Sequence, residues 1–255
     1  MPIVRRAAYY LLTAWIAITL NFFLPRIMPG DAASAAFAAQ YQRLSSNPAA
    51  LEQIRAILGI SDEPLWIQYG TYLRNLFRGE LGVSYTFFPT PVASVIGQSL
   101  PWTLALVGSA AVIAFGLGTL IGIIAAWRRG GAFDTSLPPI ALFLSAFPAF
   151  FLALLLLYLF AVTLGWFPMG HGYTPGSPPG WTWESVADLV HHAALPALTI
   201  VLISVGGWIL SMRNTMVAVL REDYIVMARA RGLRPRRIMT NYAARNAILP
   251  QVTGL

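Results

Sequence analysis

Four long apolar stretches alternate with polar segments along the 255-residue chain. They cover residues 7–24, 102–127, 138–167 and 193–211, and none of them contains an arginine or an acidic residue. A helix of about 20 mainly apolar residues is long enough to cross the hydrocarbon core of a bilayer. The pattern therefore predicts an all-α fold, a polytopic transmembrane helical bundle with four spans.

The apolar stretches also predict how a single transmembrane domain is organised. Its segments are the first span (1–25), an outer segment with short helices (26–100), three further spans (101–212), an arginine-rich segment (213–250) and the start of a fifth span (251–255). In the outer segment, Asn47 and Pro48 suit the start of a short helix that ends at Gly59. The aromatic residues that follow are typical of a membrane interface: Trp66, Tyr69, Tyr72 and Phe77.

Two features inside the spans bear on helix packing. Small residues recur at every fourth position of the second span: Ala114, Gly118, Gly122 and Ala126. Because small side chains let two helices approach closely, this ridge predicts a packing surface. Pro148 predicts a kink in the third span, since proline removes a backbone donor and clashes with the preceding turn.

Composition excludes several classes of protein. Hydrophobic residues make up 57% of the chain and charged residues only 11%, against roughly 25% charged in soluble domains. All 17 basic residues are arginine, so the chain cannot supply the lysine of an ATP-binding P-loop, and any ATP hydrolysis belongs to a partner. Cysteine is absent, which excludes disulfides and thiolate metal sites. The charge of +7 does not indicate nucleic acid, because the arginines cluster beside the spans.

The arginine distribution predicts the orientation in a bacterial or archaeal inner membrane. With the N-terminus in the cytoplasm, twelve of the 17 arginines fall on the cytoplasmic side, including Arg5, Arg6 and all eight of segment 213–250. Cytoplasmic loops are enriched in arginine, so this is the expected topology. A cleaved signal peptide is an alternative interpretation of the first span, but Pro25 and Arg26 precede any small-residue cleavage site and favour a retained anchor.

Segment 213–250 contains a pattern typical of a short surface helix followed by a second one. Glu222 and Asp223 suit a helix start, and Gly232 suits the left-handed position after its end. Pro235 then suits the first turn of the next helix, which runs towards Pro250. Four residues of the first helix fall on one face by spacing: Tyr224, Met227, Ala228 and Arg231. The alternative is a basic loop held by anionic lipid headgroups.

These residues resemble the permeases of binding-protein-dependent ABC importers, in the peptide/nickel branch. The resembling stretches are Asp223-Tyr224, 228–233 and 245–250, which look like that branch's form of the cytoplasmic EAA loop. Val226 and Met227 stand where the general pattern has the first two residues of its EAA triplet. Further landmarks of the family occur upstream in the right order, at 29–31, 58–60 and 79–84.

The resemblance implies a type I importer fold with six spans, of which this sequence holds four. The chain ends at Leu255, shortly after the EAA-like loop, so the sequence is expected to be a truncated form. In such importers the loop forms a coupling helix that sits in a groove on a cytoplasmic ATPase. The residues expected to contact the ATPase are Asp223, Tyr224, Met227, Ala228, Arg231 and Gly232.

The resemblance also implies the partners. They are a second homologous permease, two cytoplasmic ATPase subunits that bind ATP and Mg²⁺, an extracytoplasmic substrate-binding protein and membrane lipid. The chain itself would hold no cofactor and would not be an enzyme. The expected cargo is peptides, with oligosaccharides or nickel as alternatives.

Two other classes of function remain as alternatives. A membrane enzyme needs ionisable groups near a span, and the sequence offers only His191 and His192, with His171 in an outer loop. Adjacent histidines point to different sides of a helix, which favours interface residues over a metal site. A passive channel is the other alternative, and it predicts no ATPase partner.

Overall fold

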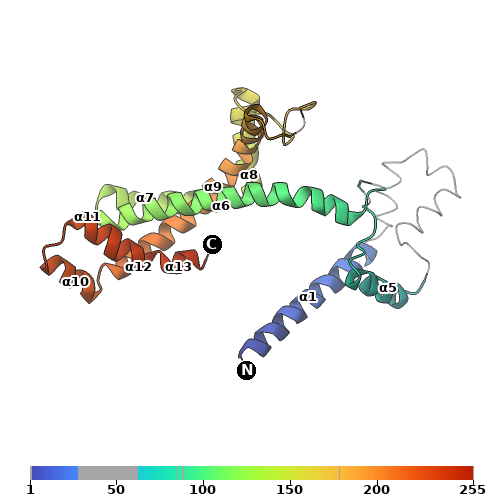
Figure 1. Ribbon diagram of the computed structural model, residues 1–255, viewed down its shortest axis with the longest axis horizontal. Coiled ribbons are helices and arrows are strands. Elements are labelled where there is room, and N and C mark those ends of the chain that lie inside the picture. Colours follow the sequence, from blue (N-terminus) through green and yellow to red (C-terminus); the bar gives the residue numbers. More distant parts are fainter. Residues whose placement is uncertain (1, 28–62, 85, 88, 178, 255) are drawn as a thin grey trace. The chain divides into compact units, whose positions relative to one another are not determined.

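The computed structural model describes residues 2–27, 63–84, 86–87, 89–177 and 179–254 (Figure 1). Within these residues the regular elements are helices, and the one extended pairing is an isolated bridge between Val83 and Pro91. The predicted all-α fold is therefore confirmed. Two compact units divide the chain, Met1–Pro101 and Trp102–Leu255, and each is described by itself. The short helix predicted to start at Asn47 lies outside the described residues.

Within the described residues, three helices are long and apolar enough to cross a membrane. They are Val4–Leu24 within α1 (Pro2–Ile27), α6 (Val92–Trp127) and α9 (Trp183–Val219). A bent pair, Ala132–Leu144 with Ala149–Thr163, passes the same test and counts as a fourth span if it crosses as one. These helices match the four predicted spans in order and position.

Two of the helices extend beyond the apolar stretches from which the spans were predicted. Helix α6 begins ten residues before the apolar stretch 102–127, and α9 extends beyond 193–211 at both ends. The cause is that hydropathy marks only the apolar part of a helix, whereas the backbone hydrogen bonds continue into its polar ends. As a result, the spanning helices do carry charged residues, including Asp134 in α7 (Ala132–Ala146) and Arg213 in α9.

In the first unit, α5 (Leu65–Phe77) packs on the C-terminal part of α1 through aromatic rings. Phe22 is 1% exposed, and its ring centre lies 5.2 Å from that of Tyr69 and 5.3 Å from that of Tyr72. The Tyr69 hydroxyl also lies 2.7 Å from the Thr19 hydroxyl. Two of the four predicted interface aromatics thus pack on α1, while Trp66 and Phe77 are exposed.

In the second unit, α6 and α9 meet along the predicted ridge of small residues. Ala114, Gly118, Gly122 and Ala126 are all buried. A Cβ on Gly122 would lie 2.8 Å from the carbonyl oxygen of Ile209, and one on Gly118 would overlap the Cβ of Trp208. The ridge is therefore a close helix contact, as predicted.

Gly122→Ala is expected to destabilise the purified protein by about 1–3 kcal/mol, because the added methyl forces two backbones apart. Gly116→Ala is the matched control, since it lies in the same helix and a Cβ there has no heavy atom within 4 Å. It should be neutral or slightly stabilising, because alanine favours helix over glycine. Thermal unfolding in detergent measures both. Equal melting temperatures for the two variants would contradict the close contact.

The third span breaks where Pro148 was predicted to kink it. Helix α7 ends at Ala146 and α8 (Ala149–Leu156) begins directly after Pro148, which has extended backbone angles. Helix α8 continues into a π-helical segment, η1 (Leu157–Thr163). Both pack on α9, where Leu152, Leu156, Ala161 and Leu195 form a buried cluster.

Candidate coupling site

The candidate site is built on helix α10, which covers Asp223–Ala230. Glu222 is its N-cap residue, Asp223 lies in its first turn and Arg229 in its last turn. Acidic residues at the start and a basic residue at the end both interact favourably with the helix dipole. The short helix predicted from these charges is confirmed.

Gly232 closes α10 with a left-handed backbone conformation, at φ = +71°. Its N–H donates to the carbonyl of Arg229 at 2.9 Å, and the N–H of Leu233 donates to the carbonyl of Ala228 at 3.3 Å. These two bonds make a Schellman motif, the usual glycine-dependent end of a helix. A Cβ on Gly232 would have no heavy atom within 4 Å, so glycine is required by the backbone angle and not by crowding.

One face of α10 rests on a hydrophobic cluster. Ile225 is fully buried and Ala228 is 3% exposed. The other buried members come from α6, from α9 and from the helical segment after α10: Ala126, Met212, Met216, Ile238, Ala243 and Ala247. The cluster therefore joins α10 directly to the ends of two spanning helices.

The predicted contact residues divide between two environments. Asp223, Tyr224, Met227, Arg231 and Gly232 are exposed, with Met227 at 56%. Ala228 differs, because its side chain packs into the cluster beneath the helix. The spacing of Tyr224, Met227, Ala228 and Arg231 does place them on neighbouring positions of a helix. The buried face, however, is the one that carries Ile225 and Ala228, so Ala228 is not available to a partner.

Sequence reasoning assigned no role to Ile225, although an apolar residue three positions before Ala228 is the signal of a buried stripe.

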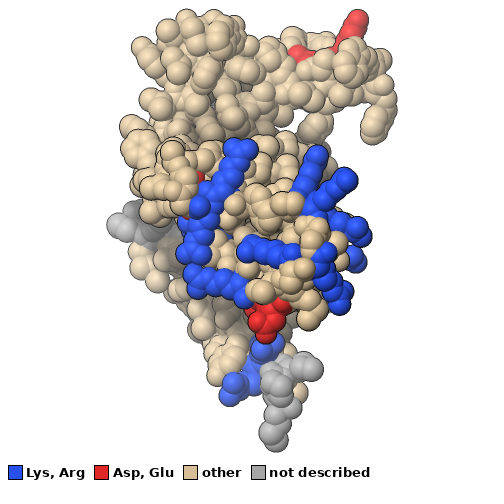
Figure 2. Space-filling view, turned by 90° about the vertical axis from the view of Figure 1, so that its left-hand side faces the viewer, with Lys and Arg blue, Asp and Glu red and all other residues tan. Residues whose placement is uncertain are grey.

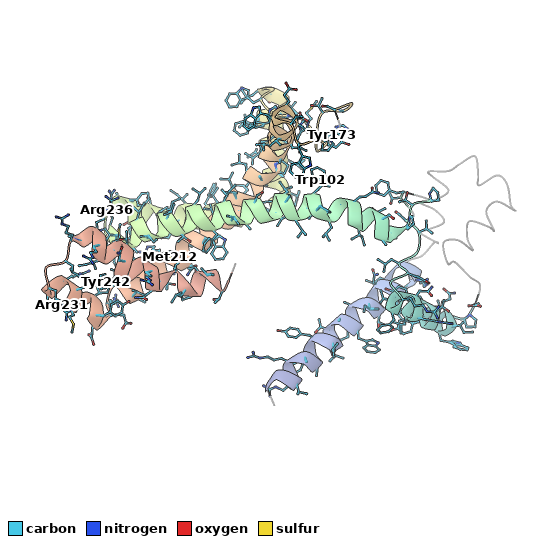
Figure 3. All side chains as sticks on the ribbon, viewed as in Figure 1. Trp102, Tyr173, Met212, Arg231, Arg236 and Tyr242 are labelled. Carbon is cyan, nitrogen blue, oxygen red and sulfur yellow. The ribbon has the colours of Figure 1, made fainter. Side chains whose placement is uncertain are left out.

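A second helical segment supports α10 from its side. It starts with Pro235 at the first position of α11 (Pro235–Arg237) and continues through η2 (Ile238–Ala244), α12 (Arg245–Ala247) and α13 (Leu249–Val252). Asn246 donates to the Tyr224 hydroxyl at 3.1 Å and to the Tyr242 carbonyl at 2.8 Å. Arg231 and Arg236 point outward from this pair of helical segments (Figure 3). The second helix is thus confirmed, and Asn246 links it to α10.

A partly buried ion pair beside this site was missed by the sequence reasoning. Arg213 on α9 donates through Nε and Nη2 to the two carboxylate oxygens of Asp134, the latter at 3.1 Å. The Gly130 N–H donates to the same carboxylate at 3.1 Å. A bidentate arginine–carboxylate pair of this kind fixes orientation as well as distance. It therefore fastens the first turn of α7 to α9, one turn before Met216 of the cluster.

The exposed surface around α10 and α11 is strongly basic (Figure 2). Among the described residues the ion pairs are Arg213 with Asp134 and His192 with Asp188. The arginines on and after α10 thus have no carboxylate partner in that part of the chain.

The histidines considered for a metal site bond to the backbone. His191 Nε2 lies 2.9 Å from the carbonyl oxygen of Trp166, and His192 Nδ1 lies 2.9 Å from that of Asp188. The His191 contact joins α9 to the preceding loop, whereas the His192 contact lies within α9 itself. The sequence favoured interface residues over a metal site, and that assignment stays a prediction.

Comparison with known proteins covers almost the whole chain. Residues 118–255 match the family described as "binding-protein-dependent transport system inner membrane component", and residues 2–107 match the N-terminal family of the same membrane component. A protein of Brucella abortus named as a peptide transport system permease is 34% identical over 253 residues, which is 98% of this chain and 76% of that protein.

Two further relatives have more specific names. The dipeptide transport system permease protein DppB of Lactococcus lactis is 28% identical over 98% of this chain and 75% of its own length. The oligopeptide transport system permease protein AppB of Bacillus subtilis is 30% identical over 92% of this chain and 71% of its own length. With both matched regions and these identities, the chain belongs to the family of binding-protein-dependent transport system inner membrane components.

Proposed function

We propose that this chain is the permease subunit of an ATP-driven importer and that its cargo is peptides. The relatives' names, which specify peptides, dipeptides and oligopeptides, support the choice of cargo. The long apolar helices support a pathway through the membrane, since their side chains are largely exposed in the single chain and need lipid or a second permease to cover them.

One observation carries the proposed mechanism, namely the position of α10 on the spans. Its buried face shares a cluster with α6 and α9, while Met227 and Arg231 face outward. A partner that binds the exposed face of α10 can therefore move the spanning helices, because Ile225 and Ala228 pack against them. Cytoplasmic ATPase subunits fit this role, and their closure on ATP and Mg²⁺ would tilt the spans between outward and inward access.

The remaining parts of the proposal follow from this arrangement. The N-terminus and α10 lie in the cytoplasm, in line with the arginine distribution. A binding protein delivers the peptide to the opposite side, and a second permease completes the pathway. The chain itself holds no cofactor and hydrolyses no ATP.

Deletion of the gene for this chain is expected to abolish uptake of labelled peptides, with restoration by the intact gene. Uptake should need ATP, because the proposed force on α10 comes from ATPase closure. Di-, tri- and hexapeptides, nickel and a labelled oligosaccharide are tested side by side in the same cells. Loss of nickel or oligosaccharide uptake with normal peptide uptake would refute the cargo assignment.

The same assay distinguishes an ATP-driven importer from a passive channel, because a channel would still carry peptide down its gradient in cells depleted of ATP. The orientation is checked in these strains with a reporter enzyme that works only outside the cytoplasm. Fused after Arg237, it should be inactive, and activity there would overturn the topology.

A further inference from the structure

A small basic pocket lies where α6, α9 and α10 meet. Its volume is about 260 Å³, and its apolar walls include Trp127 at the last position of α6 together with Val217 and Leu220 at the end of α9. Both helices are candidate membrane spans that finish at this point. Because Trp127 is also the last residue of the apolar stretch 102–127, we expect the pocket to lie near the edge of the membrane.

Three arginines line the same pocket, namely Arg129 just after α6, Arg221 just after α9 and Arg229 in the last turn of α10. All three are exposed, and none forms an ion pair within the described part of the chain. Arg129 does interact at longer range with the Asp134 carboxylate, whose charge is balanced by its ion pair with Arg213. The three nearby helix ends each contribute only about half a negative charge, so three guanidinium groups leave the pocket positive. Such a pocket attracts an anion.

We infer that this pocket binds the headgroup of an acidic phospholipid, with the phosphate on the three arginines and the acyl chains beside Trp127 and Leu220. The apolar wall distinguishes a lipid from free phosphate, which needs no such surface. The volume is below the roughly 300–1,000 Å³ of pockets that enclose whole drug-sized ligands, so it suits a headgroup whose chains remain in the bilayer. Basic pockets between spans on the cytoplasmic side are a known mode of lipid recognition.

The site has a consequence for coupling, and here the inference rests on the proposed function. Arg229 lies on α10 itself, whereas Arg129 and Arg221 lie at the ends of the spans. One bound headgroup would bridge the helix that receives the ATPase's movement and the helices that respond to it. Acidic lipid should therefore strengthen the link between ATP hydrolysis and transport.

The test uses the full importer complex and a triple variant, Arg129→Gln, Arg221→Gln and Arg229→Gln. The matched control is Arg234→Gln, Arg236→Gln and Arg237→Gln, which removes the same charge from exposed positions that do not line the pocket. Phosphatidylglycerol retained by each purified complex is measured by native mass spectrometry. About tenfold less is expected on the pocket variant than on the control, and equal losses would show general surface attraction and overturn the site.

The functional arm compares vesicles of phosphatidylcholine with vesicles that also contain phosphatidylglycerol. Wild type and the control should transport severalfold more peptide per ATP in the acidic vesicles, and the pocket variant should not respond. Inorganic phosphate added at millimolar concentration should displace little lipid, and full displacement would refute a lipid ligand in favour of a free anion. If wild type transports the same amount of peptide per ATP in both kinds of vesicle, the lipid inference alone is overturned. If it transports no peptide in either, the proposed function is refuted.

Discussion

Gly232→Val is expected to uncouple the permease from its ATPase and abolish peptide uptake, while the protein still inserts in the membrane at normal levels. A residue with a Cβ costs of order 1–2 kcal/mol in the left-handed conformation, and a β-branched residue is worse. A cost of that size shifts the closed helix end towards other conformations by about 5- to 30-fold. Since Leu233 would lose its bond to Ala228, the exposed face of α10 would no longer be presented in one orientation.

Gly232→Asn is the matched control, because asparagine carries a Cβ yet tolerates the left-handed conformation better than other residues. It should keep most of the association and uptake, with Gly232→Ala in between. Arg245→Ala removes a nearby exposed charge and should be milder than Gly232→Val. ATPase co-purification and uptake are measured together with the permease level by immunoblot. Normal association by Gly232→Val, or greater damage from Arg245→Ala, would contradict the coupling role of α10 and favour a loop held only by headgroups.

Arg213→Ala is expected to destabilise the permease by about 3 kcal/mol, because it leaves the Asp134 carboxylate buried without its cation. The Asp134 side chain is 6% exposed, whereas that of Arg213 is 22% exposed. Asp134→Ala should therefore cost less, about 1–2 kcal/mol, since the freed guanidinium can turn towards water. The free energy of unfolding of the purified permease in mild detergent provides the comparison.

The double variant Asp134→Asn with Arg213→Gln separates a lost charge pair from lost packing. Both new side chains are neutral, asparagine matches aspartate in size and glutamine keeps more of the arginine stem than alanine does, so the double variant should recover most of the stability that Arg213→Ala loses. The single neutral changes complete a double-mutant cycle. Additive effects of the two changes would show that the pair has no coupling energy. That result would contradict its role in stabilising the contact between α7 and α9.

Local chemistry made α10 predictable in detail. Its start at Asp223, its end before Gly232 and the restart at Pro235 each depend on a few neighbouring residues, and all three are confirmed. The small-residue ridge was predictable for the same reason, because its period lies within one helix. Membership in the permease family followed from these local motifs.

Features that depend on distant parts of the chain were not predictable from pattern. Asp134 and Arg213 are 79 residues apart, and only the packing of α7 on α9 brings them together. Hydropathy placed both outside the spans, so neither was considered as a partner for the other. The burial of Ala228 was missed similarly, because it depends on Met212 and Ile238 from other helices. The predicted roles of the exposed residues of α10 stay predictions.

The close contacts of the α6 glycines also limit which substitutions this permease can tolerate during evolution. At Gly122 the neighbouring Met212 Cβ and Ile209 carbonyl leave no room for one more carbon atom. A larger residue at 122 can become fixed only if the α9 backbone moves away, and a smaller residue at 212 does not remove the obstruction by the carbonyl. We therefore expect an alignment of many homologues to show strict size limits at 118 and 122 and free variation at 116, with little compensating change on α9.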